Sequence, residues 1–348
     1  MFVPPDAAYL GYYDVKTLSC LLCVLAVVGA LRRVGLFPLL AQRLVQVFRT
    51  TRGAVTALVG ITLVSSMLLT NDTALLTFLP LSWFVLERTG QTKWTALTFI
   101  LQNCAANLGG MLTPFGNPQN LYLFNHYKIP NGEFLSIMLP PFLLSTALIL
   151  LCCLFLPCEG LTVPRQETLP DKRRTAVYGV LFCVAVAMVL RGIPYWLGLL
   201  VIVMALLVLD RRALLGVDWG LLVTFAAFFT FSGNMARIEP VRELFRKLLT
   251  HGAMPVAALT SQVISNVPAA ILLSRFTDDY RGLLVGVNIG GAGTLVASLA
   301  SLITFREYTK HVKGQTGRFM VLFSAISFGF LAILLAAMTL WMQAAGLR

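Results

Sequence analysis

The chain has 348 residues, of which 57% are hydrophobic and only 12% are charged, and its mean hydropathy is +0.80. Soluble domains usually carry about twice that charged fraction, so a water-soluble globule is excluded. The apolar residues come in long runs separated by short charged loops, which indicates a polytopic, all-α membrane protein. At about 20 residues per span, such a chain holds about ten membrane-embedded helices and no soluble catalytic domain. We therefore expect an integral membrane protein that is not an enzyme.

The net charge of +12 comes from 27 Lys and Arg against 15 Asp and Glu. Basic residues of membrane proteins concentrate in cytoplasmic loops. When the chain is traced from an outside N-terminus, most of its basic residues fall in inner loops, such as 32–33, 172–174 and 310–318. The charge therefore indicates topology and not a nucleic-acid partner. The partners that we expect are a small-ion substrate and the lipid bilayer.

In chain order, the expected crossings number about 8 and are 17–31, 94–124, 134–157, 175–190, 193–209, 213–231, 282–304 and 319–342. Two further apolar stretches, 54–86 and 252–275, are interrupted by polar residues and predict re-entrant helical hairpins. In 54–86 each arm of about 15 residues rises about 21–24 Å, which is less than the hydrocarbon core of about 30 Å. Basic residues flank both ends of that stretch, which fits a single cytoplasmic side. Amphipathic surface helices are expected at 34–48, with Arg43, and at 234–250.

The sequence also contains an internal repeat. Residues 107–113 (NLGGMLT) recur as 288–294 (NIGGAGT), with five of seven positions identical or nearly so, and Thr70-Asn71 matches Ser265-Asn266 in the same order. An odd number of expected crossings separates the starts of the two copies, so the copies are inverted relative to each other. Inverted repeats with paired helix breaks are the usual construction of secondary transporters, with the site at the repeat interface.

The repeat predicts three parts of the chain. The first repeat covers 1–160 and contains the hairpin 54–86 and a broken helix at 94–124. Two additional spans and a linker occupy 161–212. The second repeat covers 213–348 and contains the hairpin 252–275 and a broken helix at 282–304.

Four polar breaks fall where hydrocarbon-embedded helix is expected, at 70–73, 107–120, 265–268 and 288–298. Lipid cannot satisfy exposed backbone groups, so such breaks persist where they line a hydrated cavity or bind a ligand. The alternative is that Gly-Gly and Pro only kink the helices or let them pack closely. Two matched pairs of breaks favour a binding site, in which carbonyl groups and Asn side chains bind a cation and helix N-termini face an anion. The candidate substrate or ion ligands are Thr70, Asn71, Asp72, Asn107, Thr113, Asn117, Asn120, Ser265, Asn266, Asn288, Thr294 and Ser298.

Asp72 is the only carboxylate inside an apolar stretch. An ionisable group at mid-depth indicates a functional site by default, and Asn71, Asp72 and Asn266 together offer oxygen ligands for Na⁺. The alternative is that Asp72 caps the second arm of its hairpin by accepting bonds from the next amides. The second hairpin has Val267 at the equivalent place, so any role of charge is confined to the first hairpin.

These residues resemble the ion transporter superfamily that contains arsenite permeases, sodium/proton antiporters of the NhaD type and divalent-anion/sodium symporters. Thr70-Asn71-Asp72, followed by Pro80-Leu81 and then by N-x-G-G-x-x-T-P-x-G-N-P-Q-N over 107–120, looks most like the citrate-transporter-like anion permeases of the YbiR type. The likeness covers residues 14–342. It implies an inverted repeat, an elevator-type mechanism and commonly a homodimer.

The resemblance also implies ligands at particular positions. Hairpin tips of the dicarboxylate symporters read Ser-Asn-Thr, whereas here they read Thr70-Asn71-Asp72 and Ser265-Asn266-Val267. The two Asn residues carry over as candidate ligands, together with Thr113, Asn117, Asn120 and Thr294 of the broken helices, and the two third-position Thr residues do not. A carboxylate repels a dicarboxylate, so the Asn-Asp tip is closer to the arsenite and sodium/proton branches.

The sequence thus predicts a secondary transporter of a small inorganic or organic anion, with Asp72 as the site of a coupling Na⁺ or H⁺ and with no other cofactor. Within transport, the alternatives are a Na⁺/H⁺ antiporter and an arsenite/antimonite-type permease. From another class, a gated ion channel could use the same broken helices. The expected location is the plasma membrane, such as the cytoplasmic membrane of a bacterium.

Overall fold

The computed structural model describes residues 3–4, 6–35, 39, 48, 50–160 and 171–346. These residues form helices joined by short loops, with one isolated β-bridge between Thr50 and Gly160 and no β-strand in the described ranges. The helices are η1 (Ala7–Tyr12), α1 (Val15–Arg33), α3 (Thr51–Leu68), α4 (Asn71–Arg88), η2 (Thr92–Trp94), α5 (Thr95–Gly109), η3 (Gly110–Leu112), α6 (Pro118–His126), α7 (Asn131–Leu154), α8 (Lys172–Val189), α9 (Tyr195–Leu209), α10 (Arg211–Leu215), α11 (Trp219–Met235), α12 (Glu239–Leu249), α13 (Ala253–Ile264), α14 (Asn266–Leu273), α15 (Tyr280–Ile289), η4 (Leu295–Ala297), α16 (Leu299–His311) and α17 (Thr316–Ala344).

The helical membrane protein predicted from composition is confirmed. Four of the described helices, α1, α3, α7 and α17, are each long and apolar enough to cross a membrane. A fifth candidate combines α11 with α12, but these two helices meet at 94°. The segment expected to form a surface helix, 234–250, contains α12. This helix runs nearly perpendicular to α11 after the bend. Its expected inner counterpart at 34–48 lies almost entirely outside the described residues.

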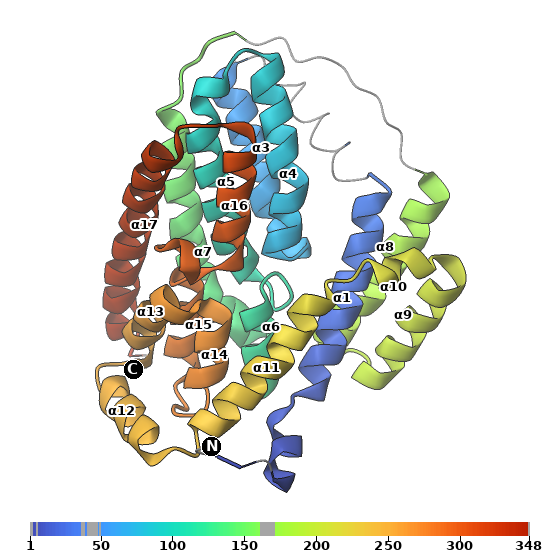
Figure 1. Cartoon of the computed structure of the whole chain (residues 1–348), viewed down its shortest axis with the longest axis vertical. Coiled ribbons are helices and arrows are strands. Elements are labelled where there is room, and N and C mark those ends of the chain that lie inside the picture. Colours follow the sequence, from blue (N-terminus) through green and yellow to red (C-terminus); the bar gives the residue numbers. More distant parts are fainter. Residues whose placement is uncertain are drawn as a thin grey trace.

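Both predicted hairpins are pairs of helices that turn at a polar tip. In the first, α3 and α4 reverse direction around Leu69 and Thr70, and their open ends lie at the same end of the molecule (Figure 1). In the second, α13 and α14 reverse at Ser265, whose φ of 75° is unusual for a residue with a side chain. The arms of the first hairpin have 18 residues each and rise about 27 Å. They are longer than expected because α3 begins three residues earlier, at Thr51, and because Asn71 and Asp72 of the tip already belong to α4.

Both predicted broken helices are also present. The first consists of α5, the short η3 and α6, and the second consists of α15, η4 and α16. Pro118 occupies the first turn of α6, where its missing N–H breaks no helical bond. The second broken helix extends to His311, beyond the expected end at 304. Figure 1 shows the breaks of both helices near the middle of the molecule, beside the hairpin tips.

One expected boundary was wrong. The crossing expected at 213–231 is divided into the short α10 and the longer α11, which begins at Trp219. The chain turns between them, and the side chain of Asp218 accepts a hydrogen bond from the amide of Leu221. Hydropathy alone does not reveal this turn, because Ala213, Leu214 and Leu215 are as apolar as the helix that follows.

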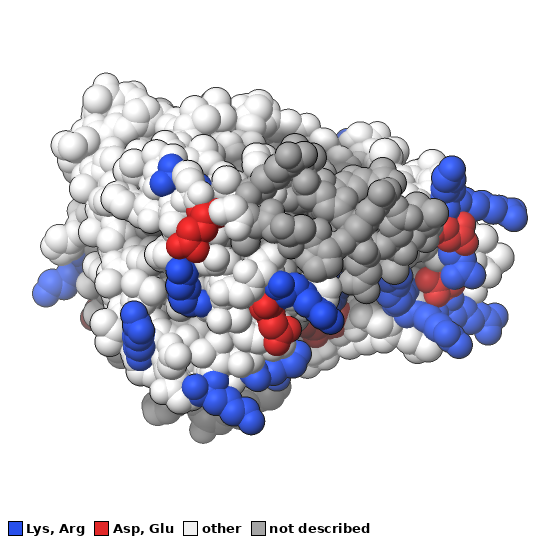
Figure 2. All heavy atoms as spheres, turned by 90° about the horizontal axis from the view of Figure 1, so that it is seen from above, with Lys and Arg blue, Asp and Glu red and all other residues white. Residues whose placement is uncertain are grey.

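The end of the molecule at which α4 ends and α17 begins is predominantly basic. Figure 2 views this end from above, and Lys and Arg side chains are spread over it with few acidic ones. The exposed residues Arg88, Lys93, Lys313 and Arg318 lie in or beside loops that the sequence assigns to the inner side. This distribution fits the orientation expected from the excess of basic residues in cytoplasmic loops.

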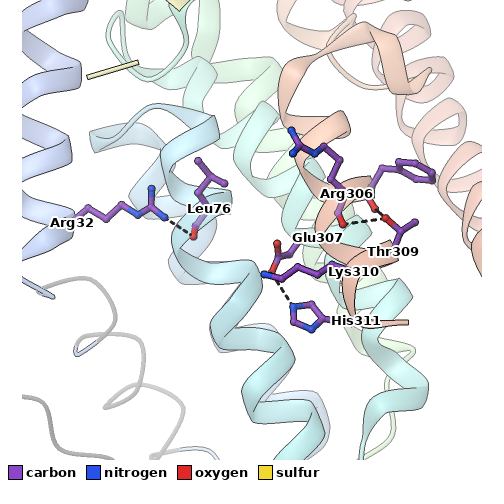
Figure 3. Close-up of polar contacts among 8 residues, drawn as sticks. Arg32, Leu76, Arg306, Glu307, Thr309, Lys310 and His311 are labelled. Carbon is purple, nitrogen blue, oxygen red and sulfur yellow. Dashed lines mark hydrogen bonds and ion pairs between the residues drawn. The ribbon is translucent and has the colours of Figure 1, made fainter. Parts of the chain in front are cut away.

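A proline in α4 creates a bond between this helix and α1. Pro80 has no N–H, so the carbonyl oxygen of Leu76, one turn earlier, has no helical donor. Arg32 of α1 donates to that oxygen from Nη2 at 3.1 Å (Figure 3). The bond joins the first hairpin to the neighbouring group of helices.

Candidate functional site

The two hairpin tips face one cavity of about 410 Å³. Its wall also includes the start of α6, the first half of α11, η4 and the first turn of α16. The hairpins, the broken helices and α11 come from distant parts of the chain and lie side by side in the fold (Figure 1). All of them contribute residues to the cavity lining. The lining residues are Asn71, Asp72, Pro118, Gln119, Asp218, Gly220, Leu221, Thr224, Phe225, Phe228, Ile264, Ser265, Asn266, Val267, Pro268, Val296, Leu299 and Leu302.

Asn71 orients the tip of the first hairpin. Its side chain is buried, its Nδ2 donates to Oδ1 of Asn107 at 3.2 Å, and its Oδ1 accepts from the amide of Asp72 at 2.9 Å. Its own amide donates to the carbonyl of Gly116 at 3.2 Å. Both the side chain and the backbone amide of Asn71 are therefore hydrogen-bonded to the first broken helix.

Asp72 follows on the cavity wall. Among the described residues, the buried Oδ1 of Asp72 has no hydrogen-bond donor. The Asp72 carboxylate receives no bond from the amides of the first turn of α4, where a capping residue would accept one. This geometry does not support the capping interpretation, and it leaves one buried carboxylate oxygen of a cavity-lining residue without a donor in the described part of the chain.

The second tip is built differently. Ser265 Oγ donates to the carbonyl of Ala297 at 3.3 Å, which ties the tip to η4. Asn266 is buried and lines the cavity. Its Nδ2 lies close to Gly291, where a Cβ would come within 3.0 Å of it. The backbone of the second broken helix thus approaches this Asn closely, and a side chain at position 291 would be in tight contact with it.

A layer of buried amides lies behind the two tips. Asn107 Nδ2 donates to Ser298 Oγ at 3.1 Å, and Asn117 Nδ2 donates to Asn288 Oδ1 at 3.2 Å. Asn288 in turn donates to Asn120 Oδ1 at 2.5 Å. Asn117 Nδ2 also donates to the carbonyl of Asn107 at 3.0 Å, so these five predicted site residues form one network that joins the two broken helices.

Three other predicted residues do not line the cavity, and two of them brace the backbone of the hairpins. Thr113 Oγ1 donates to the carbonyl of Met67 at 2.6 Å, and Thr294 Oγ1 donates to the carbonyl of Gln262 at 2.9 Å. Each acceptor lies three residues before its hairpin tip, so the same bond occurs in both halves of the chain. Thr70 Oγ1 lies 2.8 Å from Thr73 Oγ1 within the first tip.

Several residues of the site were not predicted from the sequence. Gln119 lines the cavity and donates to Asn288 Oδ1 at 3.2 Å. Asp218 lines it from the start of α11, although its sequence position indicated only a loop edge. Gln262 bonds the carbonyls of Gly290 and Ala292 and the amide of Thr294, and its place three residues before the tip was a signal that could have identified it.

The electrostatics of the cavity follow from these residues. Two carboxylates, Asp72 and Asp218, are in its lining, and none of the residues that line it is basic. In the described ranges of the chain, no three His, Cys, Asp or Glu side chains come together to hold a metal ion. The polar atoms available are carboxylate, amide and hydroxyl oxygens, which suit a hard cation.

A helical membrane protein whose hairpin tips and helix breaks meet at one polar cavity has the construction of a secondary transporter. The comparison with protein families agrees, because residues 2–278 match the citrate transporter family. The chain belongs to that family, and it is a membrane transporter of the anion-permease type. The resemblance to the ion transporter superfamily is thereby confirmed.

Three similar proteins extend this comparison. The chain is 31% identical over 322 residues to an uncharacterized transporter of Methanocaldococcus jannaschii, covering 92% of this chain and 88% of the relative. It is 31% identical over 278 residues to the inner membrane protein YbiR of Escherichia coli, covering 78% and 74%. It is 30% identical over 187 residues to the silicon efflux transporter LSI3 of rice, covering 50% and 38%.

Proposed function

We propose that this chain is a secondary active transporter that moves a small anion across the plasma membrane together with Na⁺ or H⁺. The observation that carries the proposal is the convergence of both hairpin tips on one cavity, with Asn71, Asp72 and Asn266 in its wall. The coupling cation would bind the free oxygen of Asp72 beside the amide oxygens of the two Asn residues. The anion would then bind next to this cation, which offsets part of the negative charge of the lining.

The proposed mechanism moves the hairpins and broken helices as a unit past α1, α8, α9 and α11. The buried amide network supports this division because it joins elements inside the unit. Across the boundary, the polar contacts include the Arg32 bond to Leu76 and a bond of 2.7 Å from Ser232 Oγ to the carbonyl of Ile271. The inverted repeat, the elevator-type motion and the homodimer are parts of this proposal.

A second candidate is a Na⁺/H⁺ antiporter, and the pair Asp72 and Asp218 favours it. Both carboxylates face a cavity that has no basic residue in its lining. A carboxylate can bind Na⁺ or H⁺ but not both, so one site couples the two fluxes without any anion. The same lining is compatible with an uncharged oxyacid, as in an arsenite/antimonite-type permease.

A ligand screen separates these candidates. A ligand that binds only the folded protein raises its melting temperature by mass action. We expect one anion to stabilise the detergent-solubilised protein only when Na⁺ is present or the pH is low, with citrate, phosphate, silicate, arsenite, Na⁺ and Li⁺ as probes. Stabilisation by Na⁺ and Li⁺ alone supports the antiporter, and stabilisation by arsenite alone supports the permease.

Uptake into proteoliposomes then tests active transport itself. The stabilising ligand should accumulate against its gradient when an inward gradient of Na⁺ or H⁺ is imposed, and the uptake should saturate. A conductance far above the turnover of a carrier would instead identify a gated channel.

A further inference from the structure

A second polar cavity, of about 470 Å³, lies at the opposite end of the molecule from the basic inner face. It is lined by Arg242, Arg246, Ser274, Arg275, Phe276, Thr277 and Asp278. Arg242 and Arg246 are one turn apart on α12, so they project from the same face of that helix. Arg275 follows the end of α14. Three guanidinium groups therefore face this cavity against a single carboxylate.

Basic residues are disfavoured on the outer side of a membrane protein unless they are needed. Most of the other arginines at this end have strong partners. Arg237 makes two bonds to Asp6 at 3.0 and 2.6 Å, and Arg281 bonds Glu133 at 2.6 Å. Arg191 donates to two backbone carbonyls and lies over the ring of Phe124.

The arginines of the cavity are less well satisfied. Arg242 pairs with Glu239 at 2.9 Å. Arg275 donates from Nη2 to the carbonyl of Tyr12 at 3.2 Å, but its buried Nε has no acceptor in the part of the chain that is described. No ion pair is formed by Arg246 with a described carboxylate, although its side chain faces the same space. A buried guanidinium N–H without an acceptor costs free energy unless a ligand supplies one.

The position of α12 indicates where the ligand comes from. Val241, Leu244, Phe245 and Leu248 form an apolar stripe along it, and Leu244 and Leu248 are exposed. Phe245 stacks on Phe276 at 4.9 Å between ring centroids, which fixes the helix to the loop that carries Arg275. A helix with exposed leucines on one face and arginines on another lies in the headgroup layer of a bilayer.

We propose that Arg242, Arg246 and Arg275 form an anion site for a phosphate group, supplied by the headgroup of an anionic phospholipid in the outer leaflet. Guanidinium groups match phosphate oxygens with paired, charge-assisted hydrogen bonds. The bound headgroup would supply acceptors to Arg275 and Arg246, while the exposed leucines contact its acyl chains. The site lies outside the transport cavity and does not depend on the proposed transport function.

The test uses the full chain in a neutral detergent at constant ionic strength, because salt screens such contacts. Melting temperature is measured while phosphatidylglycerol, phosphatidylcholine of the same chain length, or inorganic phosphate is titrated. The variants are Arg246→Gln and Arg275→Gln. Lys247→Gln is the matched control, since Lys247 is the basic neighbour of Arg246 but does not line the cavity.

We expect phosphatidylglycerol to stabilise the wild type more than phosphatidylcholine, and each Arg variant to weaken its apparent affinity about tenfold, while Lys247→Gln leaves it unchanged. The same pattern with inorganic phosphate alone would identify a soluble anion as the ligand of this site. Arg275→Gln could fail to fold because it loses the bond to Tyr12. In that case the Arg246→Gln variant, whose residue is exposed, still tests whether the site binds the headgroup. The proposal is overturned if neither probe stabilises the wild type, or if Arg246→Gln and Lys247→Gln respond alike.

Discussion

Asn107 and Ser298, which belong to different broken helices, are joined by a hydrogen bond of 3.1 Å. A reciprocal bond of 3.2 Å joins Asn117 to Asn288. When 107–113 is aligned with 288–294 and extended without a gap, Asn107 matches Asn288 and Asn117 matches Ser298. The two bonds therefore join equivalent pairs of positions, with the roles of the two halves exchanged. This reciprocity supports the proposed internal repeat and places its interface behind the cavity.

The first prediction concerns the stability of this network. Asn288→Ala removes the acceptor of Asn117 and Gln119 and the donor to Asn120. Buried polar groups left without partners cost about 1–3 kcal/mol, so the melting temperature in detergent should fall by several degrees. Asn131→Ala is the control, because Asn131 is exposed and makes one bond to a loop carbonyl. An equal, small effect of both substitutions would mean that the network adds no stability.

The second prediction concerns close packing in both halves. A Cβ on Gly109 would lie 2.7 Å from the carbonyl of Leu63, and one on Gly290 would lie 2.9 Å from Cα of Ala258. Gly109→Ala and Gly290→Ala should each destabilise the protein by about 1–3 kcal/mol through overpacking.

Gly60→Ala provides the matched control for these glycines. Gly60 is also helical, and nothing lies within 4 Å of its added Cβ. Alanine has the higher helix propensity, so this substitution should raise stability by up to about 1 kcal/mol. Thermal unfolding of the three variants measures both the expected losses and the expected gain in stability. A more stable Gly109→Ala or Gly290→Ala variant would show that these glycines are not closely packed.

The third prediction concerns the topology of the first hairpin. Single cysteines at Thr50 and Thr92, in a background without native cysteines, should react with an impermeant thiol reagent from the inner side only. Gly132→Cys, exposed in the first turn of α7, should react from the outer side. If Thr50 and Thr92 are labelled from opposite sides, 54–86 crosses the membrane and the inverted repeat is wrong.

The fourth prediction concerns the two tips as equivalent ligands. Asn71→Ala and Asn266→Ala each remove a buried amide from the cavity wall. A lost bond to a charged ligand costs about 1.5–3 kcal/mol, or roughly tenfold to a hundredfold in affinity. The apparent affinity for the ligand identified by the melting screen should fall accordingly, while Asn131→Ala leaves it unchanged. Unchanged affinity in both tip variants would limit these residues to a structural role.

Much of the fold could be predicted because hydrocarbon imposes simple rules on sequence. Polar and glycine residues within apolar runs identified both hairpin tips and both helix breaks, at Thr70, Gly109, Ser265 and Gly290. Lipid leaves no other place for such residues than the interior of the protein. The turn before α11 was missed because the residues on both sides of it are equally apolar.

The site could be predicted only in part, because its wall depends on packing between distant elements. Asp218 caps α11 as its local sequence suggests, yet the tilt of that helix also places it at the cavity. Conversely, Thr113 and Thr294 lie in the right motif but bond the hairpins and do not line the cavity. Periodicity assigns a residue to a helix, but it does not determine which neighbouring helix that residue faces.

We propose that Asp72 couples the flux of a cation to transport through this cavity. Asp72→Asn keeps the shape of the side chain and removes its charge, so the measurement is accumulation and exchange of the identified ligand in proteoliposomes with wild type and variant. We predict that the variant no longer accumulates ligand under a Na⁺ or H⁺ gradient and loses the pH dependence of the wild type, while ligand exchange across the membrane continues. Accumulation by Asp72→Asn with the normal pH profile would contradict the claim and move the coupling site to the neutral ligands Asn107, Asn117 and Asn288.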